Sequence, residues 1–170
     1  MDLTSNFIIV GEIYMYIPEI SNNSLTKELI EIVDIAKKLE GVETFEFDLP
    51  ATEIEIKALE EHINYSLPEE YKELLRFSNG MTLNGSTAEF FSTGSIADFY
   101  DKEKVDNFPA YYIVLANIIG DGEVLCVSRK TGKFIRYFDG EERFFDTFKE
   151  VLVKITDFIK DVDEDYLLEE

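Results

Sequence analysis

Reactive side chains are scarce in this sequence outside its carboxylates. His62 is its one histidine and Cys126 its one cysteine, whereas a zinc site closed by these two residue types needs about four ligands. We expect His62 on the solvent side of a helix, as an ordinary surface residue. Cys126 alternates with Leu125 and Val127 in an expected strand, which indicates a buried and inert thiol. No catalytic site based on histidine or cysteine is therefore expected.

Two short motifs begin like a ligand-binding loop but continue differently. The run GDGEVL starts at Gly120 and has Leu125 where a dinucleotide-binding fingerprint needs its third glycine, and an expected strand follows in place of a helix. Three alternating aspartates from Asp161 onward resemble the start of a calcium loop, but the sixth position, normally glycine, is Tyr166. We therefore expect a hairpin turn at Gly120, no metal site and no cofactor.

The carboxylates are too numerous to single out a catalytic pair. The chain carries 36 Asp and Glu residues against 16 Lys and Arg, which gives a net charge of −20. Glycoside hydrolysis needs two carboxyl groups held about 5–10 Å apart in a cleft, and Glu60, Glu73, Asp121 and Asp139 would all serve such an interpretation equally well. Tryptophan, the usual platform for sugar stacking, is absent. We expect no enzyme and assign no catalytic residue.

The net charge favours some partners over others. A charge of −20 repels the phosphates of nucleic acids and the surface of anionic membranes. A basic macromolecule is attracted, and its association is accelerated. Acidity also keeps a protein soluble, so composition alone does not separate recognition from solubility. We expect a basic protein partner, no binding to nucleic acid or membranes, and a cytoplasmic location that suits a chain without an internal disulfide.

The first fifty residues are expected to form a strand-like segment, a helix and a short strand. Residues 6–17 are rich in strand-forming types and read as one strand or a bent strand pair. Their apolar run is far shorter than the ~20 residues of a membrane span. Helical spacing begins at Leu25, and Gly41 suits a left-handed C-cap. An alternating segment follows, with three residues expected on one side: Phe45, Phe47 and Leu49.

Residues 50–80 carry clear helix boundaries. Thr52 and Glu55 form a capping box at the start of one helix. Pro68 suits the first turn of the next helix, which Asn79-Gly80 should end. The expected buried positions are Ile56, Leu59, Ile63, Tyr71, Leu74, Leu75 and Ser78, and the expected solvent-facing acids are Glu69, Glu70 and Glu73.

The second half of the chain predicts a β-meander. The segment AEFFSTGSIADFY is expected to form a strand, a turn and one short helix from Ser95. Three further strands are expected at residues 111–117, 123–129 and 133–139, joined by hairpin turns. Helices followed by a meander indicate an α+β fold, in which helices pack against an antiparallel sheet. The inner positions of the closing helix are expected at Phe148, Leu152, Ile155 and Ile159.

Several of these residues resemble the signature of the SUKH superfamily, which is named in part for a fungal cell-wall-assembly regulator. The downstream segment YYIVLANIIGDGEVLCVSRKTGKFIRYF is similar to the family's strand, Gly-Asp turn, strand, Thr-Gly hairpin and strand, and FFDTFKEVLVKI is similar to its closing helix. Met81 stands where many members have a second glycine. The matching positions of the first part are, in order, Pro50, Thr52, Glu60, Leu67, Pro68, Tyr71, Asn79 and Gly80.

The resemblance implies a SUKH-like α+β domain without catalytic machinery. We expect this single domain at residues 23–160, an N-terminal strand-like extension at 1–22 and a solvated acidic tail at 161–170. Most bacterial members are understood as immunity proteins, which bind and neutralise a toxin domain, often a nuclease, of a polymorphic toxin system. The alternative is a non-catalytic regulatory or scaffold module that binds a cellular protein, as the fungal member does.

The expected contacts with a partner are acids near the hairpin turns and one aromatic residue. Exposed aromatic residues often dominate binding energy at interfaces, although each of these acids would also serve as a solubilising loop residue. We expect a monomer or weak homodimer, with residues 7–17 as a candidate dimer seam. The candidate partner-binding residues are Asp121, Glu123, Tyr137, Asp139, Glu141 and Glu142.

Overall fold

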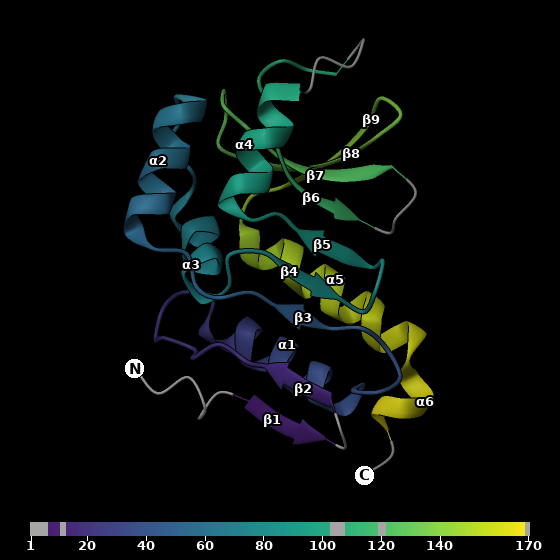
Figure 1. Ribbon diagram of the computed structural model, residues 1–170. Coiled ribbons are helices and arrows are strands. Elements are labelled where there is room, and N and C mark those ends of the chain that lie inside the picture. Colours follow the sequence, from purple (N-terminus) through teal and green to yellow (C-terminus); the bar gives the residue numbers. More distant parts are fainter. Residues whose placement is uncertain (1–6, 11–12, 103–107, 119–121, 169–170) are drawn as a thin grey trace.

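The computed structural model describes residues 7–10, 13–102, 108–118 and 122–168, and Figure 1 shows how they are arranged. Within these residues, seven strands form one antiparallel sheet in the order β3-β4-β5-β6-β7-β8-β9. Strands that follow one another in sequence are neighbours, so the sheet is a meander. Their bounds are β3 (Glu46–Phe47), β4 (Met81–Leu83), β5 (Ala88–Phe90), β6 (Tyr112–Ile118), β7 (Glu123–Ser128), β8 (Phe134–Phe138) and β9 (Glu141–Phe145).

Helices pack on this sheet, which confirms the expected α+β fold. In Figure 1, α5 crosses behind the sheet and α4 lies in front of β6. We call these two sides of the sheet the α5 face and the α4 face. The helices are α1 (Thr26–Lys38), α2 (Glu53–Ile63), α3 (Glu69–Phe77), α4 (Thr93–Lys102), α5 (Phe148–Val162) and α6 (Glu164–Leu167).

Strand register decides which side chains face α5, because successive residues of a strand point to opposite faces. One row of paired residues crosses the sheet on the α5 face, and its members on β3 to β7 are all buried. The row continues on β8 and β9 as two arginines, where the sheet surface is no longer apolar. Its members are Phe47, Met81, Phe90, Ala116, Leu125, Arg136 and Arg143.

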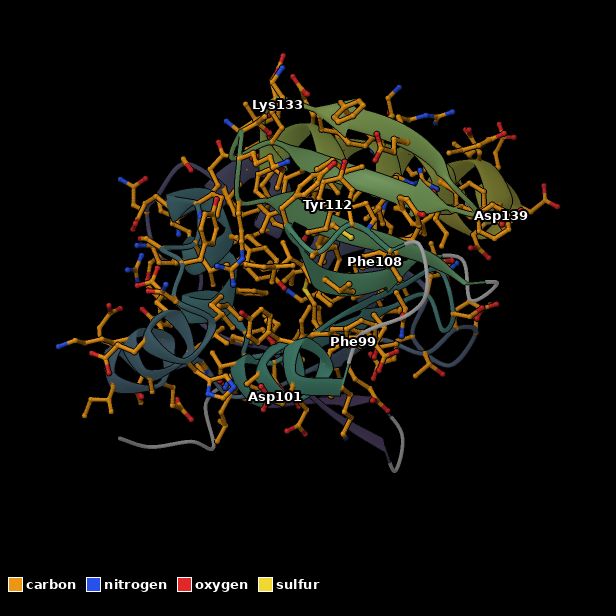
Figure 2. The ribbon with its side chains drawn as sticks, turned by 90° about the horizontal axis from the view of Figure 1, so that it is seen from above. Phe99, Asp101, Phe108, Tyr112, Lys133 and Asp139 are labelled. Atoms are coloured by element: carbon orange, nitrogen blue, oxygen red, sulfur yellow. The ribbon has the colours of Figure 1, made fainter. Side chains whose placement is uncertain are left out.

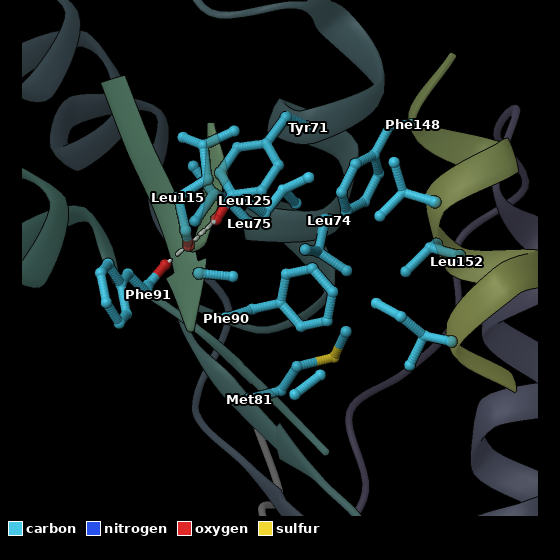
Figure 3. Packing of buried hydrophobic residues seen from close by; sticks show 14 of the residues in the cluster. Tyr71, Leu74, Leu75, Met81, Phe90, Phe91, Leu115, Leu125, Phe148 and Leu152 are labelled. Atoms are coloured by element: carbon cyan, nitrogen blue, oxygen red, sulfur yellow. Dashed lines mark hydrogen bonds between the residues drawn. The ribbon is translucent and has the colours of Figure 1, made fainter. Parts of the chain in front are cut away.

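The core is centred on Tyr71 of α3, which is fully buried. Its ring meets Phe148 of α5 edge to face at a centroid distance of 5.2 Å (Figure 3). Its hydroxyl donates to the backbone oxygen of Leu115, 3.1 Å away, where the pairing of β6 with β7 shifts register. A buried hydroxyl needs such a partner, so Tyr71 both fills the core and connects α3 to a bulge in the sheet.

Polar side chains of residues 50–80 position the neighbouring elements. The expected capping box of Thr52 and Glu55 is present at the start of α2. Glu60 accepts a hydrogen bond from the backbone N–H of Leu67 at 2.8 Å, which holds the loop between α2 and α3. Asn79 accepts one from the N–H of Thr93 at 2.8 Å, at the start of α4. These positions of the family signature therefore serve mainly as scaffold.

Several local expectations are corrected by the structure. The strands β4 and β9 were not expected, and α4 begins at Thr93 instead of Ser95. Leu49 is 58% exposed, because the alternating segment before it pairs as a strand only at Glu46–Phe47. Glu70 is not simply solvent-facing, since it bonds to the first turn of α5, and Glu73 accepts a hydrogen bond from the hydroxyl of Ser24.

Both ends of the described chain form ordered elements, a strand pair at the N-terminal end and a short helix at the C-terminal end. The strands β1 (Phe7–Val10) and β2 (Ile13–Tyr16) form a separate two-stranded antiparallel sheet, which is the second of the two expected arrangements, a strand pair and not one strand. The expected solvated tail is wrong at Asp163, which is buried and accepts a hydrogen bond from the side-chain amide of Asn84 at 3.0 Å. The short helix α6 follows, with Leu167 packed against the core.

Candidate functional site

The residues expected to contact a partner come from the end of the sheet that β7, β8 and β9 form. Asp121 lies outside the described residues, so the structure does not place it. The other five lie on these adjacent strands or on the turn that joins the last two: Glu123, Tyr137, Asp139, Glu141 and Glu142.

The hairpin of β8 and β9 holds the exposed acids in a fixed geometry. Phe138 pairs with Glu141 across a two-residue turn, Asp139-Gly140. Both turn residues have positive φ, 47° and 86°, as the type I′ turn of a tight hairpin requires. Asp139 and Glu141 are exposed, and neither has a hydrogen-bond or ion-pair partner for its carboxylate among the described residues.

Glu123 is partly neutralised by an arginine of the same sheet. Its carboxylate accepts hydrogen bonds from Nε and Nη2 of Arg136, at 2.6 and 2.8 Å. The two side chains are only 19% and 16% exposed. Because a bidentate pair of this kind satisfies the charge of the carboxylate, Glu123 presents less free negative potential to a partner than Asp139 or Glu141.

Tyr137 and Glu142 belong to an aromatic cluster on the α4 face. The ring of Tyr137 is half-buried and meets Phe108 edge to face at 5.2 Å, and Figure 2 shows Phe108 beside Tyr112. The hydroxyl of Tyr112 donates to Oε1 of Glu142 at 2.6 Å. Burial, with this hydrogen bond as the second cause, raises the pKa of Tyr112. Glu142 is therefore tied to the cluster, and Tyr137 offers only part of its ring.

Alternation along the strands divides the expected site between two faces. Tyr137 and Glu142 are paired neighbours on the α4 face. Glu123 and Glu141 are each one residue away from that row, so they lie on the α5 face. Both line a shallow depression of about 340 Å³, which Glu142 of the other row also lines, together with two arginines and an aromatic residue: Arg136, Arg143 and Phe138.

Strand β9 was not predicted from the sequence, and the exposed aromatic residues and the arginine of the β8–β9 hairpin were therefore missed as parts of the candidate surface. Phe138 and Phe144 are large, apolar and exposed, at 45% and 56%, and Arg143 pairs with Arg136 across the hairpin. The signal was present in the sequence, because Asp139-Gly140 between alternating apolar and charged residues is a strong hairpin pattern. By the register, Phe138 lies on the α5 face with Glu141 and the two arginines, whereas Phe144 lies on the α4 face with Glu142. The candidate surface is therefore a mixed one, and each face of the hairpin presents one exposed aromatic ring.

Acidic residues on α2 and α3, unlike those at the tip of the β8–β9 hairpin, form ion pairs with basic side chains. Arg76 of α3 forms ion pairs with Glu53 and Glu69, both at 2.6 Å, and Lys72 bonds to Glu69 at 3.0 Å. The guanidinium of Arg76 lowers the pKa of Glu53 and of Glu69 through hydrogen bonds. The negative charge on this side of the molecule is thus partly compensated within the protein, in contrast to the charge at the tip of the β8–β9 hairpin.

The α+β fold with this mixed surface fits a protein-binding module. The chain belongs to the SMI1/KNR4 family (SUKH-1), whose family model matches residues 50–161. Members are generally non-catalytic immunity or regulatory proteins, so membership supports a module of one of these two kinds. A comparison with curated proteins found no match. Among the helices that the structure describes, none is both long and apolar enough to cross a membrane.

Proposed function

We propose that this protein is an immunity protein, which binds and neutralises a basic toxin domain through the β8–β9 hairpin. The observation that carries the proposal is the pair of unpartnered carboxylates, Asp139 and Glu141, on a hairpin whose register fixes their positions. Exposed Phe138 pairs with Glu141 across this hairpin, and exposed Phe144 lies on its opposite face. Acids that steer a basic partner and aromatic residues that anchor it are a common combination at protein interfaces.

A nuclease is the toxin class that the charge favours. Enzymes that hold nucleic acid present lysine and arginine to its phosphates. A protein of net charge −20 is attracted to such a surface and would cover it by complementary charge. An interface of standard size buries about 1,600 Å² in total, so the hairpin would be the centre of a larger contact.

Co-expression with a toxin domain encoded beside this gene tests the proposal. The wild-type protein should restore growth and form a complex that weakens as salt rises. The double variant Glu141→Lys with Phe138→Ser should lose both properties while keeping its thermal midpoint. Asp157→Lys on α5, where the residue is also exposed, is the matched control for charge reversal and should still protect.

Full toxicity in the presence of the wild-type protein, with no complex at low salt, would overturn the proposal. The protein would then be better interpreted as a regulatory module. The absence of a toxin gene beside its own gene would support the same interpretation. Equal loss of protection in the hairpin variant and in the Asp157 control would show that bulk charge, and not the hairpin, is responsible.

A further inference from the structure

Strand β9 forms an open edge of the sheet. It is the last strand in the order of the described sheet, with β8 on one side and no described strand on the other (Figure 1). The opposite end of the sheet is less open, because β3 has only two residues and β2 packs against it. β9 has five residues, which corresponds to an edge roughly 17 Å long. Its residues 141–144 are all exposed.

The hairpin register decides which backbone groups of β9 are unused. The closing pair of a type I′ hairpin, here Phe138 with Glu141, is a hydrogen-bonded pair. Hydrogen-bonded and non-hydrogen-bonded pairs then alternate along an antiparallel ladder. The backbone of Arg143 is therefore bonded to β8, whereas Glu142 and Phe144 direct their N–H and C=O groups away from it. These outward groups have no partner among the described residues.

β9 lacks two common features that keep an edge strand from pairing with another chain. Natural edges are often interrupted by proline or by a β-bulge. β9 contains no proline, and its pairing with β8 continues over five residue pairs without a shift in register. The carboxylate of Glu142 accepts a hydrogen bond from the hydroxyl of Tyr112 at 2.6 Å, which holds this side chain over the α4 face. The backbone of the edge is therefore accessible to a further strand.

The charges around the edge select the kind of strand that fits. Asp139 and Glu141 carry free carboxylates at the turn end and attract basic residues, and Phe144 offers an apolar surface near the other end. A second copy of this chain fits poorly. The twofold-symmetric registers centred on Glu142 or on Arg143 place that residue opposite its own copy, and like charges directly opposite each other are destabilising. Each copy also carries a net charge of −20.

We infer that β9 binds an extended basic segment of a protein partner, which adds to the sheet as a further strand. Backbone hydrogen bonds to Glu142 and Phe144 supply the pairing, and alternate side chains of the segment supply the specificity. An apolar residue lies against Phe144 on the α4 face, and a basic residue lies against Glu141 on the α5 face. The inference rests on the proposed function insofar as the partner is the toxin domain, and it adds the mode of binding.

Hydrogen exchange of single amides tests strand addition in the complex. In the free protein, the amides of Glu142 and Phe144 should exchange fast, and that of Arg143 slowly, because only Arg143 is bonded to β8. Binding of the toxin domain encoded beside this gene should slow exchange at Glu142 and Phe144 by at least about tenfold. The alternation is the signature, since simple covering of the surface would not distinguish neighbouring amides.

Two variants at one position separate the backbone group from the side chain. Glu142→Pro removes the outward N–H, and proline is tolerated on an edge strand at such a position. It should weaken the complex at least about tenfold. Glu142→Thr removes the same carboxylate but keeps the N–H, and it should weaken the complex only about threefold. The exchange measurement on the wild-type protein decides the matter if the proline variant does not fold.

A peptide titration tests the edge without the toxin. The full chain, labelled with ¹⁵N, is titrated at low salt with acetyl-Thr-Val-Thr-Lys-Lys-amide. In an antiparallel arrangement this peptide sets its valine against Phe144 and its lysines against Glu142 and Glu141, so the largest shift changes should fall on residues 141–145. The control is the same peptide N-methylated at its second and third residues, which keeps its charge but loses N–H groups on both edges. It should bind at least about tenfold more weakly.

The outcomes separate this inference from the proposed function. Unchanged exchange at Glu142 and Phe144 in a complex that neutralises the toxin would overturn strand addition and leave the immunity role standing. Equal weakening by the two Glu142 variants, equal binding of the two peptides, or slow exchange at these amides in a dimer of the free protein would also overturn it. If the wild-type protein neither binds nor neutralises the toxin, the immunity role falls, and the peptide titration alone decides whether β9 accepts a strand.

Discussion

The carboxylate of Glu70, on α3, accepts hydrogen bonds from the backbone N–H groups of Phe148 and Lys149, at 2.6 and 3.2 Å. These groups belong to the first turn of α5, which has no intrahelical acceptors for them. A negative charge at a helix N-terminus is also favoured by the helix dipole. One side chain of the signature region thus caps a helix that begins 78 residues later.

Replacing Glu70 should therefore destabilise α5 and its packing. We expect Glu70→Ala to lower the free energy of unfolding by about 1 kcal/mol, measured by urea denaturation. Thr147 still caps the N–H of Glu150, which keeps the loss moderate. Glu61→Gln removes an equal charge from an exposed pair with Lys57 and should change stability by less than about 0.5 kcal/mol. Equal effects in the two variants would refute the capping role.

Gly80 offers a test of crowding that is separate from backbone strain. Gly80→Ala would bring a Cβ against Asp48 and Ser92 in a left-handed conformation, whereas Gly41 has φ of +80° with nothing within 4 Å. Gly41→Ala should cost about 1 kcal/mol through strain alone. Gly80→Ala should cost more, and it should shift the NMR signals of residues 46–48. Similar losses at both glycines would show that Asp48 does not need the space.

The hydroxyl of Tyr71 should contribute to stability apart from the ring. Tyr71→Phe keeps the contact with Phe148 but removes the hydrogen bond to the backbone oxygen of Leu115 and a longer one, of 3.4 Å, to that of Phe91. Because the oxygen of Leu115 still accepts from the backbone N–H of Phe91 at 2.8 Å, we expect a loss of about 1 kcal/mol in thermal or urea denaturation. A loss above about 3 kcal/mol would mean that the core rearranges.

Alkaline pH should unfold the protein through three buried groups. Burial raises the pKa of Tyr71, of Tyr112 and of the Cys126 thiol. A group with a raised folded pKa stabilises the fold fully below its unfolded pKa and loses this contribution as pH rises toward the folded pKa. Stability should therefore begin to fall above about pH 8.5, the ordinary value for cysteine, and more steeply above about pH 10, the value for tyrosine.

Urea denaturation between pH 7 and 11 measures this loss, and Cys126→Ala provides the control. The variant should be less stable at pH 7 because a buried side chain is truncated, but its stability should stay constant to a higher pH than that of the wild-type protein. Constant wild-type stability up to pH 11 would contradict the prediction.

Local sequence pattern was sufficient for α2, α3 and α5, although α4 begins two residues earlier than expected and α6 was not expected. The capping box at Thr52, the inward positions of α2 and α3, and the inner face of α5 all agree with the structure, since each depends on residues three or four apart. The order of β6, β7 and β8 also followed from hairpin signals. The strand β9 escaped prediction because its residues are mostly charged and exposed, so it lacks the apolar alternation that marks a half-buried strand.

The sequence by itself determined the net charge, the boundaries of α2 and α3, the fold class and the family. Only the tertiary structure decided which acids are free to act. Glu123 is paired with an arginine of the next strand, Glu70 is used by a distant helix, and Glu141 and Glu142 face opposite sides of the sheet. The first two arise from contacts between residues far apart in the chain or on adjacent strands, about which local spacing carries no information. The third follows from alternation within β9, a strand that local pattern did not predict.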